Sequence, residues 1–352
     1  MLGRSIPFCG KVLRMRVLAV EHPSFMLHEQ RLWHPERPDR LLAARAGLES
    51  APVDIVNAQA LPISADLLET LHTAEYVTAI EGFCAAGGGD LDPDTYAVAE
   101  SWEAAIRSAG AGPIAVDRLS EGAAEVAFCL VRPPGHHALA NRAMGFCIFN
   151  NAALTARYLA DRGEKVVIVD WDVHHGNGTQ DLFIADGNIL YISLHQFPFY
   201  PGGGWLDEYG YGPGAGMTVN IPVPAGTMGD VYREAFRRVI LPVARQFGPD
   251  WLLVSSGYDG HRDDPLAQIN LIESDYAYMA NSLVGVVPDG RTVVFLEGGY
   301  DLNAIQGSVA ATFSGFAGDF DMDAPAEGVS EPAAWRSLEL VEKGLGGFWK
   351  VR

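Results

Sequence analysis

Six short runs of apolar, often β-branched residues recur along the chain, and longer segments with helical periodicity separate them. Such runs are typical of strands buried on both faces of a sheet, because a solvent-exposed face would alternate polar with apolar residues. The strands are expected at 15–22, 125–137, 165–175, 188–196, 250–260 and 291–301. The clearest helices are expected at 36–50, 150–163 and 228–248. This alternation predicts an α/β fold, a single domain with a mostly parallel sheet flanked by helices on both faces.

The chain of 352 residues is long enough for one large domain, and it has no internal repeat or break in composition. The first convincing strand begins at Met15. We therefore expect residues 1–14 to form an N-terminal tail and residues 15–352 to form one folded domain. The Gly-rich segment 200–216 contains several aromatic residues, so it is expected to be an ordered surface loop near the mouth of a site.

The formal net charge of −19 argues against nucleic acid as a partner, because phosphate binding requires a basic face. It suits a cationic substrate or simply a solvated acidic surface. No stretch approaches the roughly 20 apolar residues of a membrane span, so no membrane partner is expected. The four cysteines show no paired spacing, and the N-terminus has no signal-peptide pattern, which together favour reduced thiols and a cytoplasmic location.

Polar side chains follow five of the expected strands where each strand ends. In parallel sheets the carboxyl ends of the strands meet at one edge, and ligand sites form there. Five such strand ends are hard to explain by core packing alone. The polar residues at these strand ends are His136 and His137, Asp170, Asp172 and His174, His195, Asp259, and Tyr300.

A metal site is the simplest interpretation of three of these residues. Asp172 and His174 are two positions apart in extended chain, so they point to the same side and can bind one ion together. Asp259 can complete a three-ligand site with open positions, the pattern of catalytic zinc, although oxygen and nitrogen ligands also accept iron(II). Two carboxylates cancel the ion's charge, so bound water is less acidified and a general base is needed. His136 and His137 can supply it.

The remaining polar residues acquire supporting roles. Asp170 accepting an N–H from one imidazole would favour its charged form, whereas Asn177 would orient the other ring without adding charge. Tyr300 could donate a hydrogen bond to a developing oxyanion, and the set suits hydrolysis of an amide. Four further residues are expected to be structural, namely His175 and His195 as buried rings and Asp263 and Asp264 as shapers of the loop after Asp259.

With these residues the chain resembles the histone deacetylase and acetylpolyamine amidohydrolase superfamily, and in particular its class II and bacterial branch. The resemblance spans roughly residues 16–315 in family order. The matching segments are "HPERPDRL" (34–41), "DPDTY" (92–96), "RPPGHHA" (132–138), "GFCIFNN" (145–151), "VDWDVHHGNGTQ" (169–180), "SLHQFPFYPG" (193–202), "SGYDGHRDDPL" (256–266) and "LEGGYDL" (296–302).

The resemblance implies an arginase-like α/β fold and a zinc-dependent deacetylase. It implies that Asp172, His174 and Asp259 bind zinc, that His137 is the general base and then acid, with His136 as its electrostatic partner, and that Tyr300 polarises the acetyl carbonyl. A structural potassium ion is also implied, and its ligands would be Asp170, Asp172, His174, Ser193 and the backbone around Leu194. A second potassium site is not expected, because the aromatic ligand near Met217 is absent.

The resemblance further implies a narrow tunnel for an acyl-lysine-like substrate. Gly145 and Phe146 would form one wall with Tyr200 opposite, Leu266 would lie at the rim, and Arg40 would be associated with acetate release. The acidic rim residue that grips substrate has three candidates, namely Asp90, Asp92 and Asp94. The 200–216 and 85–95 segments could shape either the tunnel mouth or a homo-oligomer interface.

Several functions stay open at this point. The acetylated amine could be acetyl-lysine, an acetylpolyamine or another small acylated metabolite. A ureohydrolase with two manganese ions would need a DxHxD pattern, but position 176 is Gly and the next is Asn177. A catalytically silent acyl-lysine-binding protein would not need His136, His137 and Tyr300 together.

Overall fold

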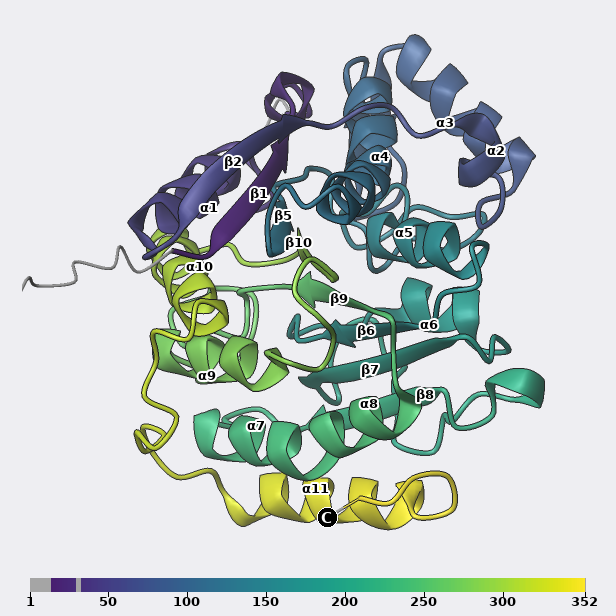
Figure 1. The fold of residues 1–352 in the computed structure, drawn as a ribbon. Coiled ribbons are helices and arrows are strands. Elements are labelled where there is room, and N and C mark those ends of the chain that lie inside the picture. The colour runs from purple at the N-terminus through teal and green to yellow at the C-terminus, as the bar shows by residue number, and fades with distance from the viewer. Residues whose placement is uncertain (1–13, 30–32, 352) are drawn as a thin grey trace, which may run out of the picture.

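One parallel sheet forms the centre of the protein (Figure 1). The computed structural model describes residues 14–29 and 33–351, so residues 1–13 of the expected tail lie outside the described part. Eight strands pair in parallel in the order β2-β1-β5-β10-β9-β6-β7-β8. Their bounds are β1 (Arg16–Glu21), β2 (Asp54–Gln59), β5 (Val126–Cys129), β6 (Val166–Asp170), β7 (Ile189–Gln196), β8 (Thr218–Val223), β9 (Trp251–Ser256) and β10 (Thr292–Leu296). The predicted α/β fold is confirmed, and this sheet is parallel throughout.

The central strands match the sequence prediction because their side chains are buried on both faces. Every residue of β5, β6, β7, β9 and β10 is buried. The two edge strands were not predicted. β2 is partly exposed along its length and reads "DIVNAQ", and β8 contains Asn220 and Pro222, which weaken its strand pattern. Proline is tolerated there because an edge strand can lack one ladder donor.

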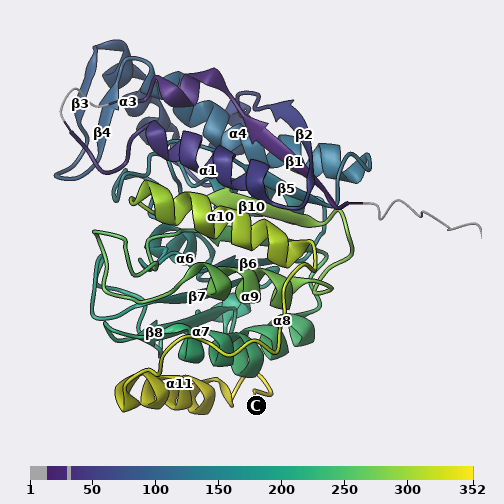
Figure 2. The same cartoon turned by 90° about the vertical axis from the view of Figure 1, so that its left-hand side faces the viewer.

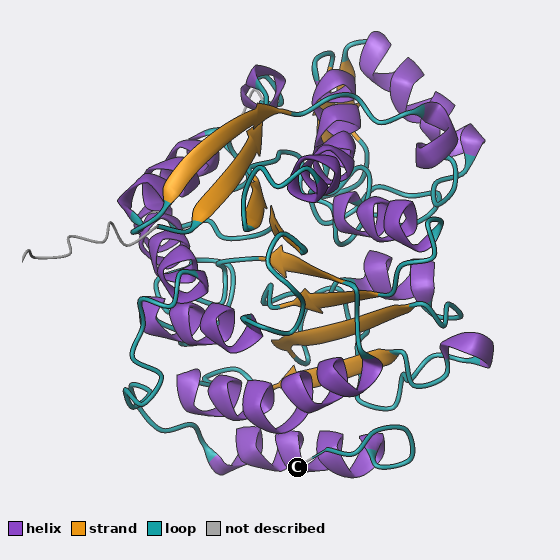
Figure 3. Cartoon of the chain, in the orientation of Figure 1, coloured by secondary structure: helices purple, strands orange, loops and turns teal. Residues whose placement is uncertain are grey.

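Helices cover both faces of this sheet (Figure 3). α4, α5 and α6 lie on one face, and α1, α10, α9 and α7 lie on the other; Figure 2 shows α1 and α10 side by side. α11 packs beside β8. The helix bounds are α1 (Asp39–Ser50), α2 (Ala65–Leu68), α3 (Ala74–Ala85), α4 (Ser101–Ser120), α5 (Asn151–Ala160), α6 (Asn177–Phe183), α7 (Gly229–Ala235), α8 (Leu241–Phe247), α9 (Glu273–Leu283), α10 (Leu302–Phe316) and α11 (Pro332–Leu345), with 3-10 turns η1 (Pro23–Met26) and η2 (Gly212–Gly214).

The helix predicted at 228–248 is divided in the structure. α7 passes into a π-helical segment, η3 (Phe236–Ile240), and then into α8. Pro242 in the first turn of α8 explains the interruption, because it has no N–H to donate to the preceding turn and its ring crowds that turn. The prediction of one continuous helix was therefore wrong at its centre.

A small subsidiary layer lies beyond α4. The antiparallel hairpin of β3 (Gly88–Asp90) and β4 (Tyr96–Val98) packs with α3 around a second apolar cluster that includes Ile80 and Phe149. The hairpin brings residues 91–95 toward the carboxyl edge of the main sheet. Within the described part of the chain, no helix is both long and apolar enough to cross a membrane.

Candidate active site

The polar residues predicted at strand ends meet at one edge of the sheet. β5, β6, β9 and β10 are neighbours, so the segments that follow them lie side by side. α5 begins soon after the His136–His137 pair with Asn150 as its N-cap, and α10 begins directly after Tyr300 with Asp301 as its N-cap. These caps satisfy the first N–H groups of each helix and fix where the preceding loop ends.

Asp172, His174 and Asp259 converge as the sequence predicted. One ligand atom from each lies within 4.8 Å of the other two. The Nδ1 atom of His174 lies 3.0 Å from Asp259 Oδ2 and 3.3 Å from Asp172 Oδ1, and both carboxylates are fully buried. The remaining carboxylate oxygens accept backbone hydrogen bonds, which leaves one oxygen of each directed at the imidazole. Gly298 N donates to Asp172 Oδ2 at 2.7 Å, and Val173 N donates to Asp259 Oδ1 at 2.9 Å.

This donor set fits a divalent cation. Two carboxylates in a buried site are costly unless a positive charge compensates them. Burial lowers the pKa of His174, but hydrogen bonds and charges from Asp172 and Asp259 outweigh it and raise the pKa to about 10. Glycine is required beside the triad, because a Cβ atom on Gly257 or Gly298 would overlap these carboxylates. Among the described residues this is the one cluster with metal-binding geometry.

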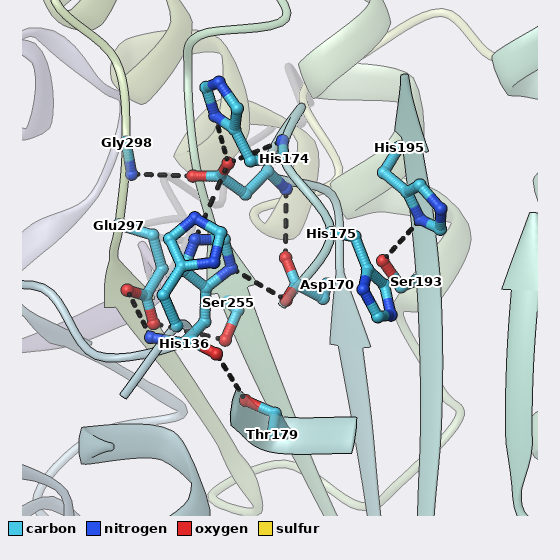
Figure 4. Close-up of polar contacts among 12 residues, drawn as sticks. His136, Asp170, His174, His175, Thr179, Ser193, His195, Ser255, Glu297 and Gly298 are labelled. Atoms are coloured by element: carbon cyan, nitrogen blue, oxygen red, sulfur yellow. Dashed lines mark hydrogen bonds and ion pairs between the residues drawn. The ribbon is translucent and has the colours of Figure 1, made fainter. Parts of the chain in front are cut away.

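His136 and His137 stand beside the triad with different partners. The Nδ1 atom of His136 lies 3.1 Å from Asp170 Oδ2, and that of His137 lies 2.8 Å from Asn177 Oδ1. Figure 4 shows His136 between Glu297 on one side and Asp170 on the other. Both contacts have the partners that the sequence predicted.

The two rings differ in charge because carboxylates favour the charged form of His136, whereas burial and neighbouring positive charges disfavour that of His137. Burial lowers the pKa of His136, but the carboxylates of Asp172 and Asp170 outweigh it and raise the pKa to about 10. For His137, burial and then the positive charges of His136 and His174 hold the pKa well below its usual value. The pair therefore offers one protonated ring and one neutral ring, which can accept a proton.

Glu297 is a buried acid that sequence reasoning missed. Its Oε2 atom accepts hydrogen bonds from Gly135 N at 2.7 Å and His136 N at 3.3 Å, and its Oε1 atom accepts from Ser255 Oγ at 3.3 Å. Burial raises its pKa to about 7, although the charge of His136 opposes the rise. A glutamate directly after the apolar run of β10 was the available signal, because it follows the same strand-end pattern as Asp170.

Arg40 lies behind the site and does not line the cavity. Its guanidinium donates to Gly299 O at 2.5 Å and to Glu297 O, and lies 5.1 Å from the centre of the Tyr300 ring. Glu36 joins it to Arg132: Glu36 Oε1 lies 2.8 Å from Arg40 Nη1 and 2.5 Å from Arg132 Nε. All three side chains are fully buried, and this ion cluster was not predicted.

A narrow cavity of about 90 Å³ opens onto His137 and onto His174 of the triad. Seven of the predicted site residues line it with one of the three candidate acids. The lining residues are Asp94, His137, Gly145, Phe146, His174, Tyr200, Leu266 and Tyr300. The Tyr200 ring packs edge-on to His137 with centroids 5.2 Å apart, and the Phe199 ring stacks on His174 at 5.2 Å.

The wall at Gly145 and Phe146 is a tight turn. Met144 and Cys147 exchange two backbone hydrogen bonds of 3.0 and 3.1 Å, and both residues between them have positive φ, +57° for Gly145 and +67° for Phe146. Positive φ at both central positions is the requirement of a type I′ turn. Glycine is needed at 145 for space as well, because a Cβ there would overlap the His137 ring.

The other candidate acids lie apart from the cavity. Asp90 is an exposed residue of β3, and Asp92 uses its carboxylate to accept from Asp94 N and Thr95 N within its own loop. Asp94 is therefore the candidate that faces the cavity. After Asp259, the Asp264 carboxylate accepts from Tyr300 N at 2.6 Å and from Leu266 N at 3.0 Å, which agrees with the expected loop-shaping role, whereas Asp263 is 68% exposed.

The residues expected around potassium occupy adjacent strands. Asp170 and Ser193 are register partners of β6 and β7, and Leu194 follows on β7. Asp170 Oδ2 also accepts from Tyr191 Oη at 3.0 Å, and Ser193 Oγ lies 2.9 Å from His195 Nδ1. The potassium site stays a prediction.

His175 and His195 are buried beside this region, with ring centroids 4.7 Å apart, as expected for structural histidines. Three larger hollows, of about 590, 530 and 520 Å³, lie elsewhere and contain none of the predicted site residues. The hollow of about 590 Å³ lies at the opposite edge, where β1, β2, β5 and β10 begin.

Known proteins match this chain in sequence and structure. A family model described as "Histone deacetylase domain" matches residues 34–316. "Histone deacetylase 15" of Arabidopsis thaliana is 42% identical over 296 residues, which are 81% of this chain and 53% of that protein, so the chain spans about half of that relative. A "Probable deacetylase" of Archaeoglobus fulgidus is 38% identical over 295 residues, covering 80% of this chain and 81% of that protein.

A solved structure supports the same likeness. The crystal structure of the HDA15 HD domain superposes with a TM-score of 0.87 at 36% sequence identity, and the superposition covers 95% of this chain and 96% of the other.

Proposed function

The chain belongs to the histone deacetylase family, and from that premise we propose that it is a metal-dependent amidohydrolase acting on an acetylated amine. The substrate would be an acetyl-lysine side chain, an acetylpolyamine or another small acylated metabolite. Water would cleave the amide to give the free amine and a carboxylate. The observation that carries the proposal is the convergence of a carboxylate–imidazole triad, two oppositely charged histidines and Tyr300 at one cavity.

Asp172, His174 and Asp259 would hold the metal ion. Zinc suits two oxygen ligands and one nitrogen ligand with open positions, and iron(II) accepts the same ligands. A divalent ion at this position would polarise the acetyl carbonyl and acidify water.

His137 would act as the general base and then as the general acid. Its low pKa keeps the ring neutral, and Asn177 Oδ1 accepts the Nδ1 proton, so Nε2 is the free acceptor. This nitrogen would take a proton from water as the oxygen bonds to the acyl carbon. It would then return the proton to the amine nitrogen as the C–N bond breaks. His136, kept protonated beside Asp170, would stabilise the negative charge that develops.

Tyr300 would donate its phenol proton in a hydrogen bond to the carbonyl oxygen. Burial and then the charge of Asp259 keep its pKa well above the usual value, so the phenol stays a donor at neutral pH. Phe146 and Tyr200 would flank the substrate's aliphatic stem, Leu266 would contact it at the rim, and Asp94 would accept an N–H of the substrate. Arg40, behind Tyr300, would assist release of acetate.

A structural potassium ion is part of the proposal. Asp170, Asp172 and His174 would bind it together with Ser193 and the backbone at Leu194. The full burial of Asp170 and its register with Ser193 support this assignment, because a buried carboxylate benefits from a nearby cation.

No observation favours the two alternative functions. A binuclear manganese site needs additional carboxylates, and the described residues contain one cluster of metal-binding geometry, with Gly176 and Asn177 at the positions in question. A silent binding protein would not require two histidines held in opposite charge states.

The test is acetate release by zinc-loaded protein from a generic acetyl-lysine peptide and from acetylputrescine. His137→Ala and Tyr300→Phe should each reduce kcat by about a hundredfold or more while leaving the circular dichroism spectrum unchanged. Wild-type rates in both variants would contradict the mechanism, and no release from any acylated amine would contradict the function.

A further inference from the structure

The tip of the β3–β4 hairpin meets the Gly145–Phe146 turn through two adjacent hydrogen bonds. Gly145 N donates to Asp94 Oδ1 at 3.0 Å, and Phe146 N donates to Thr95 Oγ1 at 3.0 Å. Two neighbouring residues of one loop therefore hold the two central residues of the other. Both loops contribute side chains to the same cavity.

The turn needs a stabilising contact at Phe146 from outside the turn itself. A bulky side chain with φ of +67° is in a conformation that L residues rarely adopt, and such residues persist only where surrounding contacts fix them. The internal bonds of the turn connect Met144 with Cys147 and leave Phe146 N directed outward. Its partner is the Thr95 hydroxyl, and Thr95 is 1% exposed.

The Thr95 hydroxyl has a second partner. It donates to Asp94 Oδ1 at 2.9 Å, so the same oxygen atom accepts from Phe146 and its proton goes to Asp94. Burial and a hydrogen bond with Asp92 raise the pKa of Asp94, and the Thr95 hydroxyl opposes that rise. The backbone of Thr95 is fixed in turn, because Thr95 N donates to Asp92 Oδ1 at 2.7 Å and Thr95 O accepts from Leu91 N at 2.7 Å.

We propose that Thr95 is a positioning residue for substrate binding: its single hydroxyl orients the Asp94 carboxylate at the rim and fixes the Phe146 wall of the cavity. The inference rests on the proposed function and deepens it. Thr95 does not line the cavity itself, so it acts through Asp94 and Phe146. Its removal should weaken substrate binding more than the chemical step.

Valine and serine separate the hydroxyl from the shape of the side chain. Thr95→Val keeps the branched shape but leaves Phe146 N unpaired and removes the donor to Asp94, so KM for an acetyl-lysine peptide should rise about tenfold, the effect of losing a hydrogen bond to a charged group. kcat should change by less than about threefold on the same scale. Thr95→Ser retains the hydroxyl and should restore KM. In an Asp94→Asn background, Thr95→Val should raise KM by less than it does alone, because one of its two partners has changed.

A buried threonine elsewhere provides the matched control. Thr155 in α5 is fully buried and donates to Asn151 O within its helix at 2.9 Å, so Thr155→Val removes a buried hydroxyl without touching the cavity. It should leave KM unchanged. Equal KM in wild type and Thr95→Val, or equal damage by Thr95→Ser and Thr95→Val, would overturn the proposal.

Binding measured without turnover separates this inference from the proposed function. Anisotropy of a fluorescein-labelled acetyl-lysine peptide, titrated with zinc-loaded protein carrying His137→Ala, gives Kd directly. Adding Thr95→Val should raise Kd about tenfold, and adding Thr95→Ser should not. Peptide binding with no acetate release by wild type would contradict the proposed function while the Kd series still tests Thr95. An unchanged Kd with active wild type would overturn only the role of Thr95.

Discussion

His136 and His137 are adjacent in sequence and their ring centroids lie 4.0 Å apart, yet one ring bonds to a carboxylate and the other to an amide. The difference between Asp170 and Asn177 is therefore a difference of one charge at nearly equal distance. Together with the charge of Asp172 beside His136 and the burial of His137, it gives one protonated ring and one neutral ring. The ionisation of the site can be changed by a single substitution.

Asn177→Asp should move the acid limb of the kcat/KM profile to higher pH. The new carboxylate favours the protonated form of His137 and raises its pKa, by about one unit or more. Because the base acts in its neutral form, a raised pKa lowers the active fraction at any pH below it, so kcat/KM should fall at acidic pH and change less at pH 7. Asn141→Asp adds the same charge on an exposed loop and should leave the profile in place. An unshifted profile in Asn177→Asp would exclude His137 as the titrating base.

Removal of the metal should abolish activity and lower Tm. Without a cation, the buried Asp172 and Asp259 carboxylates are compensated by His174 between them and by His136, whose Nε2 atom lies 3.8 Å from Asp172 Oδ1. Saturating zinc should raise Tm of chelated protein by about 5 °C or more, since binding to the folded state alone stabilises it. Asp259→Asn should lose both the zinc-induced shift and activity. Asp263→Asn, on the exposed neighbour, should keep both. A zinc shift that survives Asp259→Asn would place the ion elsewhere.

Glu36→Gln should destabilise the protein strongly. The carboxylate is the shared partner of Arg40 and Arg132, and these charges outweigh burial and lower its pKa to about 2. An amide would leave two buried guanidinium groups without a counter-charge, at a cost of about 3 kcal/mol or more in the free energy of unfolding. Glu121→Gln breaks an exposed pair with Arg118 and should cost less than about 1 kcal/mol. Urea denaturation of the zinc-loaded protein measures the free energy of unfolding of both variants. Similar losses in the two would contradict the role of Glu36 as a shared counter-charge.

His72→Gln should reduce the loss of stability on acidification. His72 is buried, donates from Nδ1 to Leu139 O at 3.0 Å and accepts from Asn150 N at Nε2, so the fold requires its neutral form. Burial lowers its pKa to about 4, whereas the unfolded chain binds this proton near pH 6.5. The stabilisation is complete above pH 6.5 and is lost as pH falls toward 4, amounting to about 3 kcal/mol over that window.

Urea denaturation between pH 7.5 and 4.5 tests this. Glutamine does not titrate, so the stability of the variant should depend less on pH below 6.5. The variant should also be less stable than wild type at pH 7.5, where the stabilisation by neutral His72 is complete. Parallel curves for wild type and variant would mean that His72 titrates alike in the folded and unfolded states.

The sequence predicted those parts of the fold that depend on burial on both faces. β6, β9 and β10 are continuous apolar runs whose starts were predicted within one residue, but their predicted ends lay four or five residues too late, and the run at 125–137 was extended further still. β5 ends at Cys129, and the chain continues irregularly to His136. The end of the strand was missed because the residues directly after it keep a similar composition. β2 carries Asn57 and Gln59 because an edge strand meets solvent, which removes the apolar signal.

The candidate site was predictable where its residues follow strands. Asp172, His174 and Asp259 were assigned from strand ends alone, and the structure brings them together. Glu36 and Arg132 are 96 positions apart, and neither periodicity nor composition indicates that they meet. Thr95 was equally hidden, because its importance lies in a hydroxyl shared between two loops.

The four residues 297–300 connect to almost every part of the site. The Glu297 carboxylate accepts a hydrogen bond from Gly135 N, and Gly298 N donates one to the Asp172 carboxylate. Gly299 O accepts a hydrogen bond from Arg40, and Tyr300 lines the cavity. A substitution in this segment therefore disturbs several contacts of the site at once, so substrate preference is difficult to change through it. Diversity in substrate preference is more readily accommodated by walls with fewer such connections, such as the Phe199–Tyr200 loop and Leu266. Directed evolution of acyl preference should accumulate substitutions in those walls and spare 297–300.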